Sequence, residues 1–323
     1  MAKITLFSEN GLKGKVPSNF PNMRTEFAWM YALDMEHIPL FDESKLVKTK
    51  DIDLGIIILP KTNIGVLMKY PHFIENIKNS CKKIAIMQEG PSWFFQDLQL
   101  QEQLWFFEQL NDADFILAHN DRDKEYYEGL LEKSVYINPT LMIEDSIPKN
   151  IDLERSGVII GGNLVRWYGG FNSLMVAQEF EENIYAPSMG RMHPSEKLLD
   201  IKHLPYMDWI TWIQQLNYYK YAVHLIPNEL AGTFSLNCAY LGIPCIGNIH
   251  SNTQRICFPD LSVEPHDMSK AKMLARMLKS DTVFYKDISD TANILYRENF
   301  GIDTYRKKWK DILKLENLIV NNE

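Results

Sequence analysis

Short β-rich runs alternate with longer helical stretches along most of the chain, and this alternation constrains the fold more than any other feature. A chain that alternates strands with helices builds a parallel sheet covered by helices. We therefore expect an α/β fold. In the first half, the expected strands are Ile4–Phe7, Leu54–Leu59, Ile84–Met87, Phe115–Ala118 and Val135–Ile137.

The alternation lapses near Pro139–Asn150, where Pro, Asp, Ser and Lys gather, and a second α/β series then begins. A chain of 323 residues suits two domains of about 150 residues each. We expect an N-terminal domain over residues 1–145 and a C-terminal domain over residues 146–323. The strands expected in the second domain are Gly157–Ile160, Asn183–Ala186, Tyr221–Ile226, Pro244–Gly247 and Leu261–Val263.

Helical patterns fill the intervals between these strands, and the last 40 residues read as one or two further helices. The final one, ending in Tyr305–Leu315, is amphipathic and basic. We expect it to pack back across the first domain, and a membrane-facing or DNA-facing helix is the alternative. The other expected helices are Thr25–Glu36, His72–Cys81, Leu98–Leu110, Arg122–Leu131, Asn172–Glu181, Trp209–Leu216, Thr233–Leu241 and Lys270–Lys279.

Composition excludes several classes of protein. A hydrophobic content of 46% with 24% charged residues is typical of a globular chain. No apolar run approaches the roughly 20 residues that span a bilayer, and the N-terminal residues enter a strand pattern without a signal peptide. We therefore expect a cytoplasmic protein.

The four cysteines form no Cys-x-x-Cys pair, and we interpret them as buried thiols. A net charge of −8 gives no support to DNA as a partner, although it leaves room for a local basic patch.

A glycine-rich loop follows the first expected strand of the second domain, over residues 161–170. Glycines such as Gly162 let the backbone approach a ligand, and the start of the next helix favours phosphate. Arg166 could add a charge-assisted hydrogen bond. The alternative is an ordinary connecting loop with a surface arginine, because neither the dinucleotide-binding nor the Walker A pattern is present.

A second segment, residues 227–237, ends a strand, carries a carboxylate and opens a helix. The amides of Gly232, Thr233 and Phe234 would face a diphosphate. Glu229 could accept hydrogen bonds from sugar hydroxyls, and Asn237 lies further into the same helix. The alternatives are a loop acid for Glu229 and a satisfied helix residue for Asn237.

This segment resembles the donor-site motif of GT-B glycosyltransferases, in which Glu-x7-Glu precedes a small-residue helix and a Gly-x-Pro strand. Glu229 matches the first acid, and Asn237 occupies the place of the second. The resemblance implies two Rossmann-like domains facing each other across a cleft, with the donor on the second. It also implies that the first acid contacts the donor sugar and the second position the ribose.

The resemblance has departures. The basic residues usual in the family's glycine loop would fall at Asn163 and Tyr168, and neither is basic. Arg166 and Arg191 would then neutralise the diphosphate.

The resemblance also implies that the loop before Trp209 lines the nucleotide base. Tyr206 would form an aromatic wall of this base site or, alternatively, part of a structural Pro-Tyr turn.

Glu89 follows an expected strand of the first domain and is the candidate general base for an acceptor hydroxyl. His119, at the next strand tip, is the competing base, and both residues have ordinary structural interpretations. The chain also has a distant similarity to phage DNA β-glucosyltransferases.

We therefore expect a glycosyltransferase that moves a sugar from a nucleotide sugar, with a UDP-sugar favoured over a GDP-sugar, to a hydroxyl acceptor. No metal is expected, because no Asp-x-Asp pair stands at a strand end. No cofactor is expected either, because the nucleotide sugar is a substrate. The alternatives are a phage-type DNA base glycosyltransferase, a nucleotide-sugar epimerase and a non-catalytic nucleotide-sugar sensor.

Overall fold

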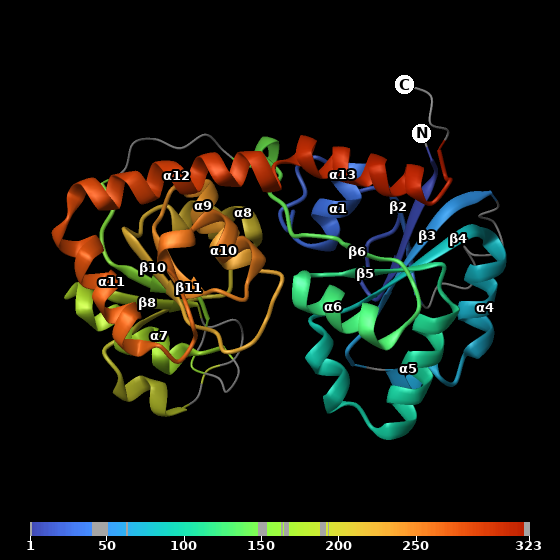
Figure 1. Cartoon of the computed structure of the whole chain (residues 1–323), viewed down its shortest axis with the longest axis horizontal. Helices are drawn as coiled ribbons and strands as arrows, with labels where there is room; N and C mark the ends of the chain where they lie inside the picture. Colours follow the sequence, from blue (N-terminus) through green and yellow to red (C-terminus); the bar gives the residue numbers. More distant parts are fainter. Residues whose placement is uncertain are drawn as a thin grey trace. The chain divides into compact units, whose positions relative to one another are not determined.

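The computed structural model describes residues 2–40, 51–62, 64–147, 154–162, 164, 168–187, 192 and 194–319. These residues form two compact units, each with its own parallel sheet (Figure 1). Unit 1 contains Met1–Ser18, Glu26–Pro139 and Ile302–Glu323, and unit 2 contains Asn19–Thr25 and Thr140–Gly301. Neither unit is one continuous stretch of chain.

Unit 1 is built on a six-stranded parallel sheet in the order β2-β1-β3-β4-β5-β6. One row of paired residues, Phe7, Ile57, Ile86 and Ile116, crosses four of its strands and has no solvent exposure. Parallel strands covered on both faces need such continuous apolar runs. The strands are β1 (Ile4–Ser8), β2 (Glu36–Pro39), β3 (Ile52–Leu59), β4 (Cys81–Gln88), β5 (Phe115–Ala118) and β6 (Val135–Ile137).

The helices of unit 1 include one from the far end of the chain. Tyr305 and Trp309 of α13 both donate to the side-chain oxygen of Asn138, at 2.7 and 3.2 Å, and both rings are buried. This places α13 in the core of unit 1. The helices and 3₁₀ turns are α1 (Glu26–Leu33), α3 (Ile64–Leu67), α4 (Pro71–Ser80), η1 (Ser92–Asp97), α5 (Leu100–Asp112), α6 (Asp121–Leu130) and α13 (Ile302–Leu315).

Unit 2 repeats this architecture with the strand order β12-β11-β10-β7-β8-β9, again all parallel. Its central row joins Ile160, Val223 and Ile246, all without solvent exposure. The strands are β7 (Val158–Ile160), β8 (Ile184–Pro187), β9 (Lys202–Leu204), β10 (Tyr221–His224), β11 (Cys245–Asn248) and β12 (Ser262–Val263).

The helices of unit 2 connect these strands, and the longest follows the last of them. The helices are α7 (Gly170–Ala177), α8 (Trp209–Leu216), α9 (Thr233–Leu241), α10 (Asn252–Cys257), α11 (Met268–Ser280) and α12 (Thr282–Phe300), and the 3₁₀ turns are η2 (Glu144–Ser146), η3 (Gln178–Phe180), η4 (Pro194–Leu198) and η5 (Pro259–Leu261). None of the helices in the described ranges combines the length and the apolar character needed to cross a membrane.

Two edge strands differ from the sequence-based expectation. The helix expected to reach Glu36 ends at Leu33, because Asp34 adopts a left-handed conformation (φ 53°) and the chain then turns into β2. The loop expected before Trp209 is preceded by β9, which is not among the strands expected from the sequence. Both strands are only three or four residues long, too short for an alternation pattern to stand out.

A short excursion of the chain, Asn19–Thr25, belongs to unit 2 although both of its flanks belong to unit 1. The carbonyl of Pro21 accepts from the amide of Ile210 at 3.1 Å, and the side-chain oxygen of Asn22 accepts from the amide of Trp209 at 3.1 Å. The excursion therefore supplies acceptors to amides at the start of α8, which otherwise lack helical partners.

Candidate functional site

The carboxyl ends of the parallel strands in unit 2 carry the glycine-containing loop that precedes α9. Ligands of open α/β sheets gather at this edge. Gly232 is the N-cap of α9 in a left-handed conformation (φ 78°) and makes no side-chain capping bond. The N-cap residue therefore does not neutralise the positive end of the helix dipole, which favours an anion here.

Only glycine fits at position 232. A Cβ atom there would lie 1.9 Å from Oγ1 of Thr253 and 2.6 Å from Oγ of Ser251. The carbonyl of Gly232 accepts hydrogen bonds from Oγ1 of Thr253 at 2.7 Å and Oγ of Ser235 at 3.1 Å. These contacts fix the start of α9 against the loop that follows β11.

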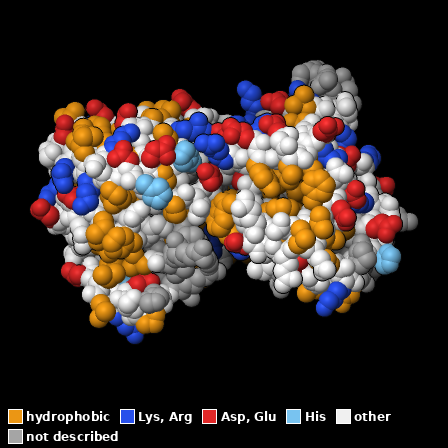
Figure 2. Space-filling model, turned by 60° about the horizontal axis from the view of Figure 1, so that its bottom comes forward, with side chains coloured by type: hydrophobic (Ala, Val, Ile, Leu, Met, Phe, Trp, Pro, Cys, Tyr) orange, Lys and Arg blue, Asp and Glu red, His pale blue; other side chains and the backbone are white. Residues whose placement is uncertain are grey.

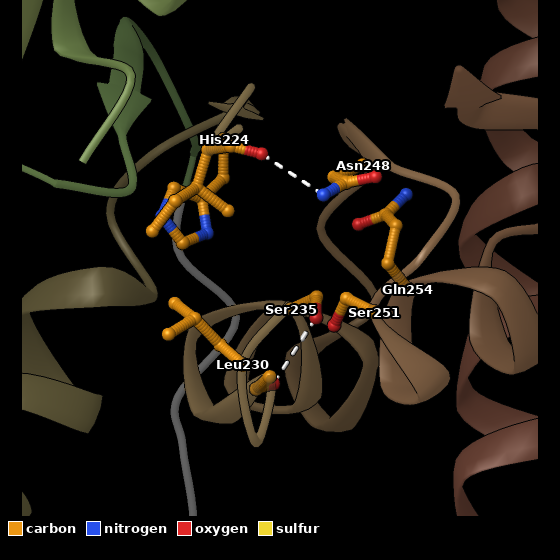
Figure 3. A pocket seen from close by; sticks show the side chains of 8 residues that line it. His224, Leu230, Ser235, Asn248, Ser251 and Gln254 are labelled. Carbon is orange, nitrogen blue, oxygen red and sulfur yellow. Dashed lines mark hydrogen bonds between the residues drawn. The ribbon is translucent and has the colours of Figure 1, made fainter. Parts of the chain in front are cut away.

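A hollow of about 230 Å³, counting its open mouth, lies beside the first turn of α9 (Figure 3). It lies at the ends of β10 and β11, and its enclosed part has room for about one water-sized group. Its lining contains no Lys, Arg, Asp or Glu among the residues that the structure describes there: His224, Ile226, Leu230, Gly232, Ser235, Asn248, Ser251 and Gln254.

His224 ends β10, and its ring is folded over the edge of the sheet. Gly161 makes room for it, because a Cβ atom on that glycine would lie 2.5 Å from Cγ of His224. The ring packs edge-on against Phe234, with centroids 5.2 Å apart. Burial lowers the pKa of His224 to about 4, so the imidazole is neutral at pH 7. Its Nε2 atom is buried and has no hydrogen-bond partner within the described part of the chain.

Gln254 of α10 faces the same hollow from the other side (Figure 3). Gly247 makes room for it, since a Cβ atom there would lie 2.5 Å from Oε1 of Gln254. The amide nitrogen donates to the carbonyl of Cys245 at 2.8 Å. Oε1 is buried without a partner among the described residues. By contrast, Asn248 is satisfied, because its amide donates to the carbonyl of Ile226 at 3.0 Å and its oxygen accepts from the amide of His250 at 2.9 Å.

The structure brings together several of the residues predicted for the donor. Gly232 lines the hollow, Phe234 contacts His224, and Glu229 lies half-buried in the loop directly before Leu230 of the lining. The hydroxyl of Thr233 lies 3.3 Å from that of Thr140. These residues surround one strand-to-helix connection.

Two predicted donor residues have other surroundings. Asn237 is 2% exposed. With its amide turned to suit its neighbours, its nitrogen donates to the carbonyl of Thr233 and its oxygen accepts from Nε1 of Trp212, both at 3.2 Å. Tyr206 is 66% exposed, and its hydroxyl accepts from Arg24 at 3.2 Å. A ribose contact by Asn237 would require it to exchange its present partners.

The glycine-rich loop after β7 has a packing role in its described part. A Cβ atom on Gly162 would lie 2.9 Å from Cβ of Tyr168, so the loop closes on itself there. The predicted phosphate-binding residues Asn163, Arg166 and Arg191 lie outside the described residues.

In unit 1, Glu89 directly follows β4 at the corresponding edge of the sheet. Its carboxylate accepts from the amide of Lys61 at 3.1 Å, and Nζ of Lys61 lies 3.4 Å from its other oxygen. The two side chains are 43% and 39% exposed, so this ion pair contributes little to stability. Glu89 is thus positioned by the loop after β3 and remains open to solvent.

His119 follows β5 and is bonded through one nitrogen. Its Nε2–H group donates to the carbonyl of Gln88 at 2.9 Å, and Nδ1 is buried with no partner in the described ranges. Burial lowers the pKa of His119, while the charge of Asp123 opposes that shift. Its Nδ1 lone pair is therefore available as a hydrogen-bond acceptor.

Glu26 is a candidate that the sequence interpretation missed. Burial raises the pKa of this carboxyl group, hydrogen bonds from Asn10 and Ser8 lower it, and the charges of Glu89 and Glu9 raise it further. Glu26 opens α1, the first helix after β1. An acid at the start of the helix that follows the first strand was the available signal.

Among the described residues on the face in Figure 2, Lys and Arg side chains are interspersed with Asp and Glu. Hydrophobic side chains show on both parts of this face. On α5, Leu100 and Leu104 are 70% and 56% exposed.

No protein-family model matches the sequence, and no curated protein matches it. Solved structures do match the fold. HepE from Anabaena, in complex with UDP and glucose, is 9% identical with a TM-score of 0.65, and the match covers 98% of this chain and 100% of that one. An α-glucosyltransferase in complex with UDP and a 13-mer DNA is 14% identical with a TM-score of 0.60, covering 97% and 99%.

A mutant of TarM from S. aureus, in complex with fondaparinux, α-GlcNAc-glycerol and UDP, is 11% identical with a TM-score of 0.61. The match covers 84% of this chain, which spans only 57% of TarM. At these identities the likeness concerns the fold. The two α/β units, each with a six-stranded parallel sheet, and the likeness to these structures confirm the expected fold class, the GT-B fold.

Proposed function

We propose that this chain is a glycosyltransferase that moves a sugar from a nucleotide-sugar donor to a hydroxyl acceptor. The observation that carries the proposal is the connection from β10 to α9. There a helix N-terminus, a left-handed glycine as its N-cap and a hollow without charged side chains among its described lining residues lie together at the carboxyl edge of a parallel sheet. This combination favours a phosphate-containing ligand whose remaining groups are uncharged.

The donor is assigned to unit 2. The amides of Thr233 and Phe234 would bind the diphosphate, and Arg166 and Arg191 would neutralise its charge. Glu229 would accept hydrogen bonds from the sugar hydroxyls. We favour a UDP-sugar, because the similar structures named above were solved with UDP.

The proposed reaction is a displacement at the anomeric carbon. The acceptor oxygen forms a bond to that carbon, its proton passes to Glu89, and the bond to the diphosphate breaks with its electron pair going to the departing oxygen. The helix-end amides would stabilise the negative charge that develops on the diphosphate. His119 and Glu26 are the other candidate bases.

The acceptor is proposed only as a hydroxyl-bearing molecule. DNA carrying a hydroxylated base is a second candidate, favoured by the likeness to the α-glucosyltransferase solved with DNA. The net charge of −8 gives it no support, so a saccharide acceptor is tested first.

Incubation with UDP-sugars and GDP-sugars tests the proposal through release of free nucleoside diphosphate. A transferase releases the diphosphate by transfer or slow hydrolysis, whereas an epimerase returns an intact nucleotide sugar and a sensor only binds. Binding is followed in parallel by thermal shift, since a ligand that binds the folded state raises its melting temperature. Absence of both binding and release with every donor would reject the proposal.

Glu229→Ala refines the same test. If Glu229 contacts the sugar, the variant should lose about tenfold in affinity for the nucleotide sugar and much less for the bare nucleoside diphosphate. Glu298→Ala, which removes an exposed acid from α12, is the control. Equal losses for both ligands would place Glu229 on the nucleotide.

A further inference from the structure

Two residues that line the hollow beside α9 each have a buried polar atom that is unbonded within the described residues. The atoms are Nε2 of His224 and Oε1 of Gln254. His224 is 9% exposed and Gln254 is 1% exposed. Buried polar atoms are nearly always bonded, so two such atoms on residues that line one hollow indicate a missing partner.

Resting on the proposed function, we infer that this hollow binds one hydroxyl group of the nucleotide-sugar donor, with His224 and Gln254 as its hydrogen-bonding partners. A hydroxyl both donates and accepts. It would donate to Oε1 of Gln254 and, in the tautomer with the proton on Nε2, accept from Nε2–H of His224. In that tautomer a carbonyl could serve only the imidazole.

The charge of the hollow supports a neutral group rather than a phosphate. The described lining residues include neither a cation nor an anion, and the low pKa of His224 keeps the ring neutral at pH 7. A phosphate in this space would lack a counter-charge, which is costly in a desolvated site. The anionic part of the donor is better served by the amides at the start of α9.

The other polar side chains around the hollow are already bonded within the protein. Oγ of Ser235 donates to the carbonyl of Gly232 at 3.1 Å and lies 2.7 Å from Oγ1 of Thr253. Oγ of Ser251 lies 3.3 Å from the same Thr253 oxygen. His224 and Gln254 therefore offer the unused hydrogen-bonding capacity.

Two glycines of the sheet edge make this arrangement possible. Gly161 leaves space for the ring of His224, and Gly247 leaves space for the amide of Gln254. A larger residue at either position would push these polar groups out of the hollow. The backbone thus makes room for two side chains, each of which has one buried polar atom without a partner in the described part of the chain.

The experiment compares His224→Leu and Gln254→Met with wild-type protein, using calorimetric titration with UDP, UDP-glucose, GDP and GDP-mannose. Each variant should bind about tenfold more weakly to the nucleotide sugar that wild type prefers, because one hydrogen bond is lost. The melting temperature of His224→Leu without ligand should stay unchanged or rise, since the substitution removes an unbonded buried atom. That of Gln254→Met should fall, because this substitution also removes the amide that donates to the carbonyl of Cys245 at 2.8 Å. A purely structural role of the two residues would leave the affinity of both variants unchanged.

Thr5→Val is the matched control. It removes another buried atom that lacks a partner among the described residues, Oγ1 of Thr5 in β1 of unit 1. It should leave every affinity at the wild-type value.

The ligands of the panel identify the source of the hydroxyl. If the variants lose affinity for the nucleotide sugar alone, the bound hydroxyl belongs to the transferred sugar. If they lose as much affinity for the bare nucleotide, the hydroxyl belongs to the ribose. Wild-type affinity in both variants would overturn the inference and leave the proposed function intact. Failure of wild-type protein to bind any of the four ligands would instead count against the proposed function.

Discussion

The carboxyl edges of the two sheets differ in how their polar groups are used. In unit 1 the edge is charged and largely bonded within the protein: Glu89 pairs with Lys61, and both ends of the Gln88 amide are bonded, to Pro91 at 2.9 Å and to Tyr127 at 2.6 Å. In unit 2 the hollow is uncharged, and it leaves two buried polar atoms unbonded in the described part of the chain.

This contrast indicates a division of labour within one architecture. A charged, solvent-open carboxylate suits proton transfer, whereas a neutral, desolvated hollow suits hydrogen bonding to a ligand. His119, with its unbonded Nδ1, is the exception in unit 1. The following predictions test the contrast, beginning with the largest expected effect.

Glu89→Gln tests whether the edge of unit 1 transfers the proton. If Glu89 is the base of an inverting transfer, the variant should keep its donor affinity and lose about 10²–10⁴-fold in turnover. The amide preserves the shape of the carboxylate but cannot accept the proton at neutral pH. Initial rates give turnover, and NMR of the product gives its anomeric configuration.

Glu75→Gln, an exposed acid on α4, is the control and should retain wild-type turnover. Wild-type turnover in Glu89→Gln, or a product with retained configuration, would contradict the assignment. His119 would then be the next residue to substitute.

The pH dependence of unfolding tests whether His224 is buried as a neutral group. Its pKa is about 4 in the folded protein against an ordinary 6.5. As the pH falls, His224 is therefore protonated in the unfolded chain before it is protonated in the folded protein. The contribution of this residue to the free energy of unfolding is fully present above pH 6.5 and is lost as the pH falls towards 4. The difference corresponds to about 3 kcal/mol. Urea unfolding should show this dependence weakened in His224→Leu, and an unchanged profile would contradict it.

Gly232→Ala tests the fixed start of α9. The left-handed backbone and the close approach of Thr253 should cost about 2–3 kcal/mol of unfolding free energy. Gly129→Ala in α6 is the matched control, because open space surrounds that position. It should stabilise the protein by about 0.5–1 kcal/mol. Equal effects of both substitutions on urea unfolding would contradict the packing described for Gly232.

Glu26→Gln has the smallest expected effect and tests the charge at the edge of unit 1. Burial raises the pKa of Glu26 above its ordinary value of 4.5. As the pH rises, the carboxyl group loses its proton in the unfolded chain before it does so in the folded protein. Glu26 therefore lowers the free energy of unfolding as the pH rises from 4.5 through the raised pKa of the folded protein. Thermal melts should show Glu26→Gln more stable than wild type at pH 8 and similar to it at pH 4. A lower melting temperature at pH 8 would contradict this assignment.

Much of the fold was predictable because its central elements have strong patterns. The bounds of α8, α9 and β5 agree with those expected from the sequence. The short edge strands β2 and β9 were missed because pairing with a neighbouring strand defines them more than their own residues do. Local sequence carries little information about such pairing.

The candidate site was less predictable for a related reason. The loop at Gly232 could be predicted from its glycine and from its position before a helix. By contrast, His224 and Gln254 come to line the same hollow only after two strands and a helix are assembled. Their common feature is an unbonded atom, which depends on the whole surrounding structure. A histidine at the end of a buried strand was the one signal available.

The discontinuity of unit 1 has a consequence for synthesis on the ribosome. Residues 302–323 complete this unit, yet all of Thr140–Gly301 is translated before them. Until α13 emerges, the side chain of Asn138 lacks the partners that Tyr305 and Trp309 provide. The packing of unit 1 is therefore complete only after the last helix is made, so unit 2 can finish folding first although its translation begins later.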